Sequence, residues 1–281
     1  MNILAARHYL RFINYYRLSG YGYLFEEAHV AGNRSHKFRS GTSFDTLLAL
    51  YVFDRHLRLL VMDAIERIEV SFRTVLAYEL SHKYQSAHWF MDAALFKESD
   101  TFSHVEFIRM VRNETGLTAA AGSDRQQRRE CFISHYYQNY RDPELPAIWM
   151  LIEIMTLGTW SRVYAHLNES KARKQVSRAF DLSPQTLDSW LHSLTYLRNR
   201  CAHHSQIYGR SNAFPPALRP GWPDLHEGAF ARYIAVLEYM LRKVAPDTGW
   251  GRKVKDLIQG EPCVDPAVLG IQNNDFWECD L

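Results

Sequence analysis

Cysteine is scarce in this sequence and is nowhere spaced for a metal or redox site. Only four cysteines occur among 281 residues, and no two of them have the C-x-x-C spacing. With no secretory leader ahead of them, they are predicted to be ordinary thiols of a cytoplasmic protein. His82 and His88 also lack a third ligand at metal-binding spacing. We therefore predict no metal and no cofactor.

Long apolar runs and a strong excess of one charge are also missing. No run approaches the ~18 apolar residues that a membrane span needs, and the first residues lack the apolar core of a signal peptide. The net charge of +2 argues against a non-specific nucleic-acid coat, although it leaves room for a local basic groove. A soluble cytoplasmic protein without a membrane partner is predicted.

The motifs of several common enzyme classes are absent as well. The sequence contains no P-loop, no His-Glu-x-x-His and no Gly-x-Ser-x-Gly. Gly20-x-Gly22 lacks the third glycine of a dinucleotide-binding loop, so we predict a packing turn that breaks a short helix over residues 3–16. Cys201 is a poor candidate for a nucleophile beside His203, because residues two apart on a helix diverge.

What the sequence does contain is helical periodicity, with 47% hydrophobic residues to bury. The longest periodic segment covers residues 43–81 and has neither Gly nor Pro. It is expected either as one unbroken spine helix or as a helix broken once near its middle. Strand-type alternation is nearly absent, so the predicted fold class is all-α. Further helices are predicted over residues 101–112, 159–168, 170–180, 183–203 and 226–244.

The predicted organisation is a single helical domain over residues 1–245 followed by a tail. Loops are expected near residues 28–42, 113–130 and 209–228, where Gly, Pro and basic residues interrupt the periodicity. The basic residues of the first two loops are interpreted as solvated, with RNA contact as the alternative. Residues 246–281 are loop-rich and aromatic, and they are predicted to wrap against the domain.

The most informative stretch is the end of the helix predicted over residues 183–203. Ser183 followed by Pro184 is a good helix start. Arg198 projects along the apolar stripe of this helix, so its guanidinium needs a carboxylate or phosphate partner. Asn199 and His203, four residues apart, share one flank of the helix. An arginine, an amide and an imidazole are therefore expected to converge near the helix end.

These residues also carry a resemblance to known families. Arg198, Asn199, Ala202 and His203 resemble the Arg-x4-6-His signature of HEPN-type ribonucleases. Other blocks resemble the Abi-like family of abortive-infection proteins, in the right order over about residues 8–245. Relatives usually carry an extra segment before the first block, so a short or misassigned start is one interpretation of this sequence. The blocks are Tyr-Tyr-Arg-Leu-Ser-Gly-Tyr (15–21), Tyr-Val-Phe-Asp-Arg-x-Leu-Arg (51–58), Ile-Glu-Arg-Ile-Glu-Val-Ser-Phe-Arg (65–73) and Pro-Ala-x-Trp-Met (146–150).

The resemblance implies an HEPN-like helical bundle acting as a metal-independent endoribonuclease, a toxin of bacterial phage defence. RNA supplies its own nucleophile, the 2′-hydroxyl, so the protein must move protons and stabilise the phosphorane. Histidine suits the first task and arginine the second. His203 is accordingly assigned as general acid/base and Arg198 as the phosphate ligand, while Asn199 orients either the imidazole or an oxygen. His204 is the alternative histidine.

Partners and supporting residues complete the prediction. The resemblance implies an RNA substrate and a homodimer with a composite active site, and an antitoxin protein or small RNA is a candidate partner. Supporting roles are predicted for Glu66, Glu69 and Arg73, with two alternatives. Either Glu66 or Glu69 reaches Arg198, or Glu69 simply pairs with Arg73 four residues later. The RNA-binding candidates are Arg58, Arg200, Tyr208 and Arg210.

A second function remains open from the sequence. A helix-terminal histidine beside an asparagine is often only a C-terminal cap that favours the helix dipole. The alternative to an enzyme is therefore a non-catalytic RNA-binding or scaffold module with the same basic pocket.

Overall fold

The computed structural model describes residues 3–27, 37–118, 123–124, 129–222, 225–272 and 274–277. Within these residues the regular elements are α-helices and short 3-10 turns, and β-structure is limited to isolated bridges. The prediction of an all-α fold is therefore confirmed. In this part of the chain, no helix has both the length and the apolar character that crossing a membrane requires.

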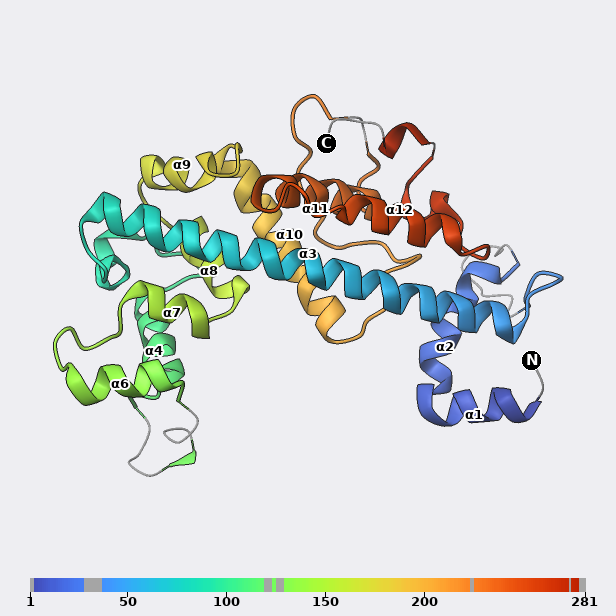
Figure 1. Cartoon of the computed structure of the whole chain (residues 1–281), viewed down its shortest axis with the longest axis horizontal. Helices are drawn as coiled ribbons and strands as arrows, with labels where there is room; N and C mark the ends of the chain where they lie inside the picture. Colours follow the sequence, from blue (N-terminus) through green and yellow to red (C-terminus); the bar gives the residue numbers. More distant parts are fainter. Residues whose placement is uncertain are drawn as a thin grey trace. The chain divides into compact units, whose positions relative to one another are not determined.

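The longest helix is α3 (Phe44–Tyr84), which runs for 41 residues without a break (Figure 1). Ser43 caps its start, with the Thr46 N–H 3.1 Å from Ser43 Oγ. Apolar side chains such as Leu50, Phe53 and Leu57 are buried at three- and four-residue steps. Of the two alternatives predicted for residues 43–81, the unbroken helix is the one observed. At 1.5 Å per residue it is about 60 Å long.

The chain divides into two compact units, residues 1–66 with 196–281 and residues 67–195. The boundary passes through α3 and through α10, so each of these helices contributes residues to both units. The remaining helices of the first unit are α1 (Ile3–Ile13), α2 (Tyr15–Gly22), α11 (Phe230–Val244) and α12 (Trp250–Gly260). Those of the second unit are α4 (His104–Glu114), α6 (Cys131–Asn139), α7 (Ile148–Ile154), α8 (Leu157–Ala165) and α9 (Ser170–Arg178), and α10 spans Pro184–Ala202.

The core of the first unit is built on α11, which buries most of its residues. Helix α12 lies in the segment expected to be a loop-rich tail, where no helix was predicted. It buries Trp250, Val254 and Ile258 at four-residue steps. The Trp250 indole N–H donates to the Leu60 carbonyl of α3 at 2.7 Å. This helix was missed because only one apolar residue per turn is buried between exposed polar ones.

The N-terminal break lies at a different residue from the one predicted. Helix α2 continues through Gly20 to Gly22, so the prediction that these glycines break the helix was wrong. The chain instead turns at Asn14, which has a positive φ of 74° with a ψ of 138°. Its side chain then caps α2 by accepting the Tyr16 N–H at 2.9 Å.

Parts of two of the three predicted loops fall outside the described residues. The residues left undescribed are 28–36 in the first loop and 119–122 and 125–128 in the second loop. In the third, the described residues 209–222 and 225–228 contain no helix, as the prolines predicted.

Candidate functional site

The site is organised around the C-terminus of α10. Ser183 caps the start of this helix through the Thr186 N–H at 3.0 Å, as predicted. At the other end, the His204 N–H donates to the Cys201 carbonyl and the Ser205 N–H to the Arg200 carbonyl. This is a Schellman C-cap with His204 at its left-handed position, at a φ of 57°. Glycine usually occupies that position, so the histidine is held there against a backbone preference.

A buried carboxylate fixes the loop that follows the cap. Asp54 of α3 is fully buried. Its Oδ1 accepts the backbone N–H groups of Ile207 at 3.0 Å and Tyr208 at 2.7 Å. Its Oδ2 accepts the Tyr21 hydroxyl at 2.7 Å and pairs with Arg58. Burying a charge is costly unless it is paired and hydrogen-bonded, and both of these conditions are met here.

Arginines from three elements hold the carbonyl groups at the end of α10. Arg17 of α2 donates to the His204 carbonyl at 2.6 Å, and Arg58 lies 3.3 Å from the Ser205 carbonyl. Arg200 of α10 itself donates to the Gln206 carbonyl. These cations lie where the helix dipole is negative. The backbone of residues 204–206 is therefore held by side chains of α2 and α3, which are distant in sequence, and by Arg200 of α10 itself.

Burial alters the protonation of this network. It raises the pKa of the Asp54 carboxyl, while Arg58 and the hydrogen-bond donors act in the opposite direction. Burial and the neighbouring Asp54 also raise the pKa of Tyr21 well above its ordinary value. Burial raises the pKa of the Cys201 thiol to about 12. Cys201 therefore stays protonated at neutral pH, which removes it as a nucleophile.

An open pocket of about 560 Å³ adjoins this helix end. It is lined by Ile13, Asn14, Tyr16, Arg17, Gly20, Tyr21, His203, His204, Ser205, Gln206 and Arg210. We call it the histidine pocket. Both histidines are exposed, and Arg17 and Arg210 add two permanent charges. The pocket thus combines groups that can move protons with groups that can bind phosphate.

Close approach of the Gln206 side chain to Gly20 of α2 shapes one wall of the histidine pocket. A Cβ added at Gly20 would lie 2.7 Å from Gln206 Oε1. Gln206 in turn donates from Nε2 to the Tyr208 carbonyl at 2.9 Å and accepts from Arg210 Nε at 3.3 Å. The Arg210 guanidinium also lies 5.4 Å from the centre of the Tyr23 ring. The Gln206 side chain can lie this close to α2 because position 20 has no side chain.

The structure brings some predicted site residues to this pocket and not others. His203, His204 and Arg210 line it, whereas Arg198 and Asn199 are not among its lining residues. Arg198 is half-buried, and its guanidinium has no hydrogen bond or ion pair with the described residues. Asn199 is exposed one turn before His203, whose N–H donates to its carbonyl at 3.0 Å. The catalytic roles of Arg198, Asn199 and His203 stay predictions.

Three of the residues expected to contact RNA have internal partners. Arg58 is only 6% exposed and pairs with Asp54. Tyr208 is buried, and its hydroxyl accepts the Asp265 N–H at 2.9 Å. Arg200 is half-buried and is bound to the Gln206 carbonyl. In this structure, these side chains hold the loop in place, and Arg210 is the candidate that faces the pocket.

The structure describes the predicted pair between Glu69 and Arg73 within α3, whereas contact of either carboxylate with Arg198 stays a prediction. Glu69 pairs with Arg73 on α3 and accepts the Leu157 N–H at 3.1 Å. Glu69, Arg73 and Leu157 all lie in the second unit, and Glu69 is buried. Glu66 is exposed on α3. The Glu69–Arg73 pair is thus observed, and it stabilises the start of α8.

Sequence reasoning missed several residues of the histidine pocket. Asn14, Tyr16, Arg17 and Gln206 had no assigned role, although the block at residues 15–21 was noted as a family match. Arg17 and His204 lie 187 positions apart. No local periodicity links positions so distant, and the shared block was the only signal that could have drawn attention to α2.

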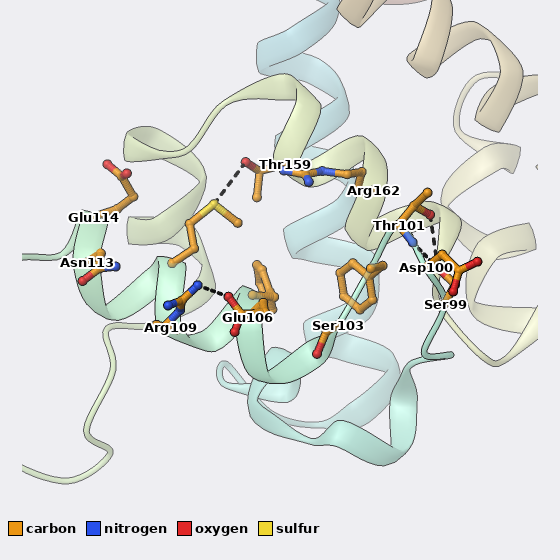
Figure 2. Close-up of a pocket in the computed structure, with 13 residues that line it drawn as sticks. Ser99, Asp100, Thr101, Ser103, Glu106, Arg109, Asn113, Glu114, Thr159 and Arg162 are labelled. Atoms are coloured by element: carbon orange, nitrogen blue, oxygen red, sulfur yellow. Dashed lines mark hydrogen bonds and ion pairs between the residues drawn. The ribbon is translucent and has the colours of Figure 1, made fainter.

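A second pocket, of about 490 Å³, lies in the second unit and is a poorer candidate. Figure 2 shows Asn113 and Glu114 at one end of it and Ser99, Asp100 and Thr101 at the other. Its acidic side chains are Asp100, Glu106 and Glu114, and it has no histidine or cysteine among its lining residues. Arg109 pairs with Glu106 at an exposed position, where ion pairs contribute little. Three carboxylates against two arginines make this pocket unsuited to an RNA strand.

The fold and the histidine pocket together define an all-α protein with a basic, histidine-bearing site. In the described residues, no group of three or more His, Cys, Asp and Glu side chains is arranged to hold a metal ion. The family described as Abi-like protein matches residues 8–209, and the chain belongs to this family. Membership points to abortive infection, a form of phage defence. No curated protein and no solved structure gives a significant match.

Proposed function

We propose that this protein is a metal-independent endoribonuclease of phage defence, acting as an abortive-infection toxin. The observation that carries the proposal is the histidine pocket itself. Two exposed histidines and two arginines share the wall of an open pocket of about 560 Å³. Family membership supplies the biological setting, and the resemblance to the HEPN signature supplies the reaction class.

The proposed reaction is attack by the RNA 2′-hydroxyl on the neighbouring phosphorus. A basic imidazole takes the 2′-hydroxyl proton as the O–P bond forms. The 5′-oxygen leaves as its bond to phosphorus breaks, and an imidazolium returns a proton to it. The products are a 2′,3′-cyclic phosphate and a 5′-hydroxyl. Histidine suits both proton transfers because its ordinary pKa is near 6.5.

His203 is the proposed acid/base, with Asn199 orienting its ring from the preceding turn. His204 is the weaker candidate, because its backbone forms the left-handed cap and its carbonyl binds Arg17. Arg210 is proposed to bind the substrate phosphate within the pocket. Arg198 keeps the phosphate role that the signature implies. Its guanidinium has no partner in the described part of the chain, so it is available to an incoming phosphate.

A homodimer completes the proposal. Each copy supplies a single His203, whereas the reaction needs one base and one acid. Two copies that face each other would place two such imidazoles at one composite site. An antitoxin protein or a small RNA would restrain the enzyme before infection.

The experiment is cleavage of total RNA by the purified protein in EDTA. The variants are His203→Ala, His204→Gly, Arg198→Ala and Arg210→Ala. Glycine is the better control at position 204 because it accepts the left-handed backbone. His203→Ala is expected to lower the rate by roughly 10²- to 10⁴-fold, whereas His204→Gly keeps it. The new ends should be cyclic phosphates.

The outcomes separate the enzyme from the binding module. Intact RNA with retained, salt-sensitive binding would favour a non-catalytic RNA-binding or scaffold protein. Cleavage by His203→Ala at the wild-type rate would remove this residue from the mechanism. Expression in bacteria adds a further test, since wild type should stop growth and His203→Ala should not.

A further inference from the structure

The second unit carries a pocket whose lining is almost entirely cationic. Lys83, Lys171, Lys174, Gln175 and Arg178 line a space of about 560 Å³. Four of these five residues are positively charged and none is acidic. None of them belongs to the histidine pocket. The proposed role of the histidine pocket therefore does not account for the positive charge of this second site.

Three of the cations lie on one face of α9. Lys171, Lys174 and Arg178 follow one another at steps of three and four residues, which places them side by side along the helix. The opposite face is buried through Ala172 and Val176. We call the three cations the α9 basic cluster. All three are exposed, and their charged groups make no hydrogen bond or ion pair with the described residues.

This arrangement is unfavourable for α9 by itself. Like charges three and four residues apart repel each other. Lys171 also lies in the first turn, where the helix dipole disfavours a cation. An anion bound over this face would relieve both the repulsion between the cations and the unfavourable interaction of Lys171 with the helix dipole, because it neutralises the cations.

Nearby carboxylates do not remove the charge of the cluster. Glu169 binds Lys83 at 2.9 Å, and the Lys83 hydrogen bond, together with a smaller effect of the Lys171 charge, lowers the pKa of this carboxyl. Glu79 accepts from Gln175 Nε2 at 2.6 Å. These contacts fix two lining side chains of the pocket. The cations of the cluster itself stay available to a ligand.

We propose that the α9 basic cluster binds phosphate groups. Ammonium and guanidinium groups bind phosphate through charge-assisted hydrogen bonds. The three residues span eight positions of α9, about 10 Å along the axis, so the site accepts more than one phosphate. These phosphates belong either to an RNA strand or to a free polyphosphate. The RNA source rests on the proposed function, whereas phosphate binding does not.

The test compares two sets of substitutions that remove the same charge. The cluster variant is Lys171→Gln, Lys174→Gln and Arg178→Gln. The control variant is Arg252→Gln, Lys253→Gln and Lys255→Gln on α12, which belongs to the first unit. Both are made in the full chain with His203→Ala, so that RNA stays intact. Far-UV circular dichroism checks that each variant is folded.

Binding is measured with a fluorescent single-stranded RNA of 20 nucleotides and with inorganic tripolyphosphate. A site that contacts an RNA backbone through three cations contributes about 2 to the slope of log K against log salt, at about 0.7 per contact. The cluster variant should lose this amount, and the control variant should keep the wild-type slope. Loss of tripolyphosphate binding alone, with RNA binding unchanged, would support the phosphate site and assign it to a free polyphosphate.

The inference is overturned if the cluster variant binds both probes as wild type does. It is also overturned if the control variant loses as much binding, or if the wild-type chain binds neither probe. Its failure is distinct from failure of the proposed function. A chain that does not cleave RNA, but whose RNA binding depends on the cluster, would refute the nuclease and keep the phosphate site.

Discussion

Asp54→Asn is the most decisive perturbation of the site that leaves every proposed catalytic group in place. The native carboxylate accepts two backbone N–H groups and the Tyr21 hydroxyl, and it pairs with Arg58. An asparagine of the same shape keeps one acceptor oxygen. Its NH₂ group then takes the place of the second carboxylate oxygen and faces hydrogen-bond donors, to which it cannot bond. The substitution therefore leaves Arg58, which is only 6% exposed, as a buried charge without its partner.

The expected magnitude follows from that unpaired charge. Removing one member of a buried ion pair costs about 3–5 kcal/mol. Unfolding free energies of whole domains are only about 5–15 kcal/mol, so this is a large fraction. Tyr21→Phe removes a single hydroxyl from the same carboxylate and should cost about 1.5–3 kcal/mol. Asp54→Asn should therefore lower the free energy of unfolding more than Tyr21→Phe does.

Amide hydrogen exchange is the assay, because it reports locally within a chain of two compact units. The amides of Ile207 and Tyr208 donate directly to Asp54. A loss of 3–5 kcal/mol corresponds to a protection factor lowered by roughly 150- to 5,000-fold. The matched control is Asp188→Asn, which breaks the partly exposed pair with Arg173. Exposed pairs contribute at most about 1 kcal/mol, so this variant should change little.

Hydrogen exchange can also refute the role assigned to Asp54. If Asp54→Asn leaves the protection of both amides within a factor of about five of wild type, the carboxylate does not hold the loop. The same conclusion would follow if Asp188→Asn caused an equal loss of stability. RNA cleavage is a second assay of Asp54→Asn, because a loosened loop should lower the cleavage rate although His203 is still present.

Three further outcomes follow from backbone conformation and burial. His204→Gly should raise the unfolding free energy by about 0.5–1 kcal/mol, because glycine relieves the left-handed φ of 57°; equal or lower stability in urea denaturation would contradict this. Gly209→Ala should cost at least about 1–2 kcal/mol, since φ is 70° and the new Cβ would lie 2.8 Å from Leu24 Cδ2; a variant as stable as wild type would refute it. Burial raises the pKa of Tyr208 to about 12, whereas an unfolded tyrosine loses its proton near pH 10. The unfolded state therefore releases its proton first, so stability should fall by about 2–3 kcal/mol as pH rises from 10 to 12. Tyr208→Phe should flatten this part of the curve in melts followed by circular dichroism.

Local pattern was enough to predict the helices whose apolar stripe is continuous. Helix α3 and helix α10 were both expected near their observed ends, and the Ser183 cap was expected at its residue. Helix α12 was missed because its buried residues are separated by charged and polar ones. Asn14 was missed as a break because its positive φ leaves no periodic signal.

The sequence by itself determined the all-α class, the long spine and the presence of two histidines at a helix end. These follow from side-chain spacing, because a helix repeats every 3.6 residues whatever surrounds it. Only the tertiary structure decided what faces those histidines. Arg17 and Arg210 line the histidine pocket, whereas Arg58 is buried against Asp54. The reason is that a charge is directed inward or outward by the partners that packing brings to it, and those partners lie up to 187 positions away.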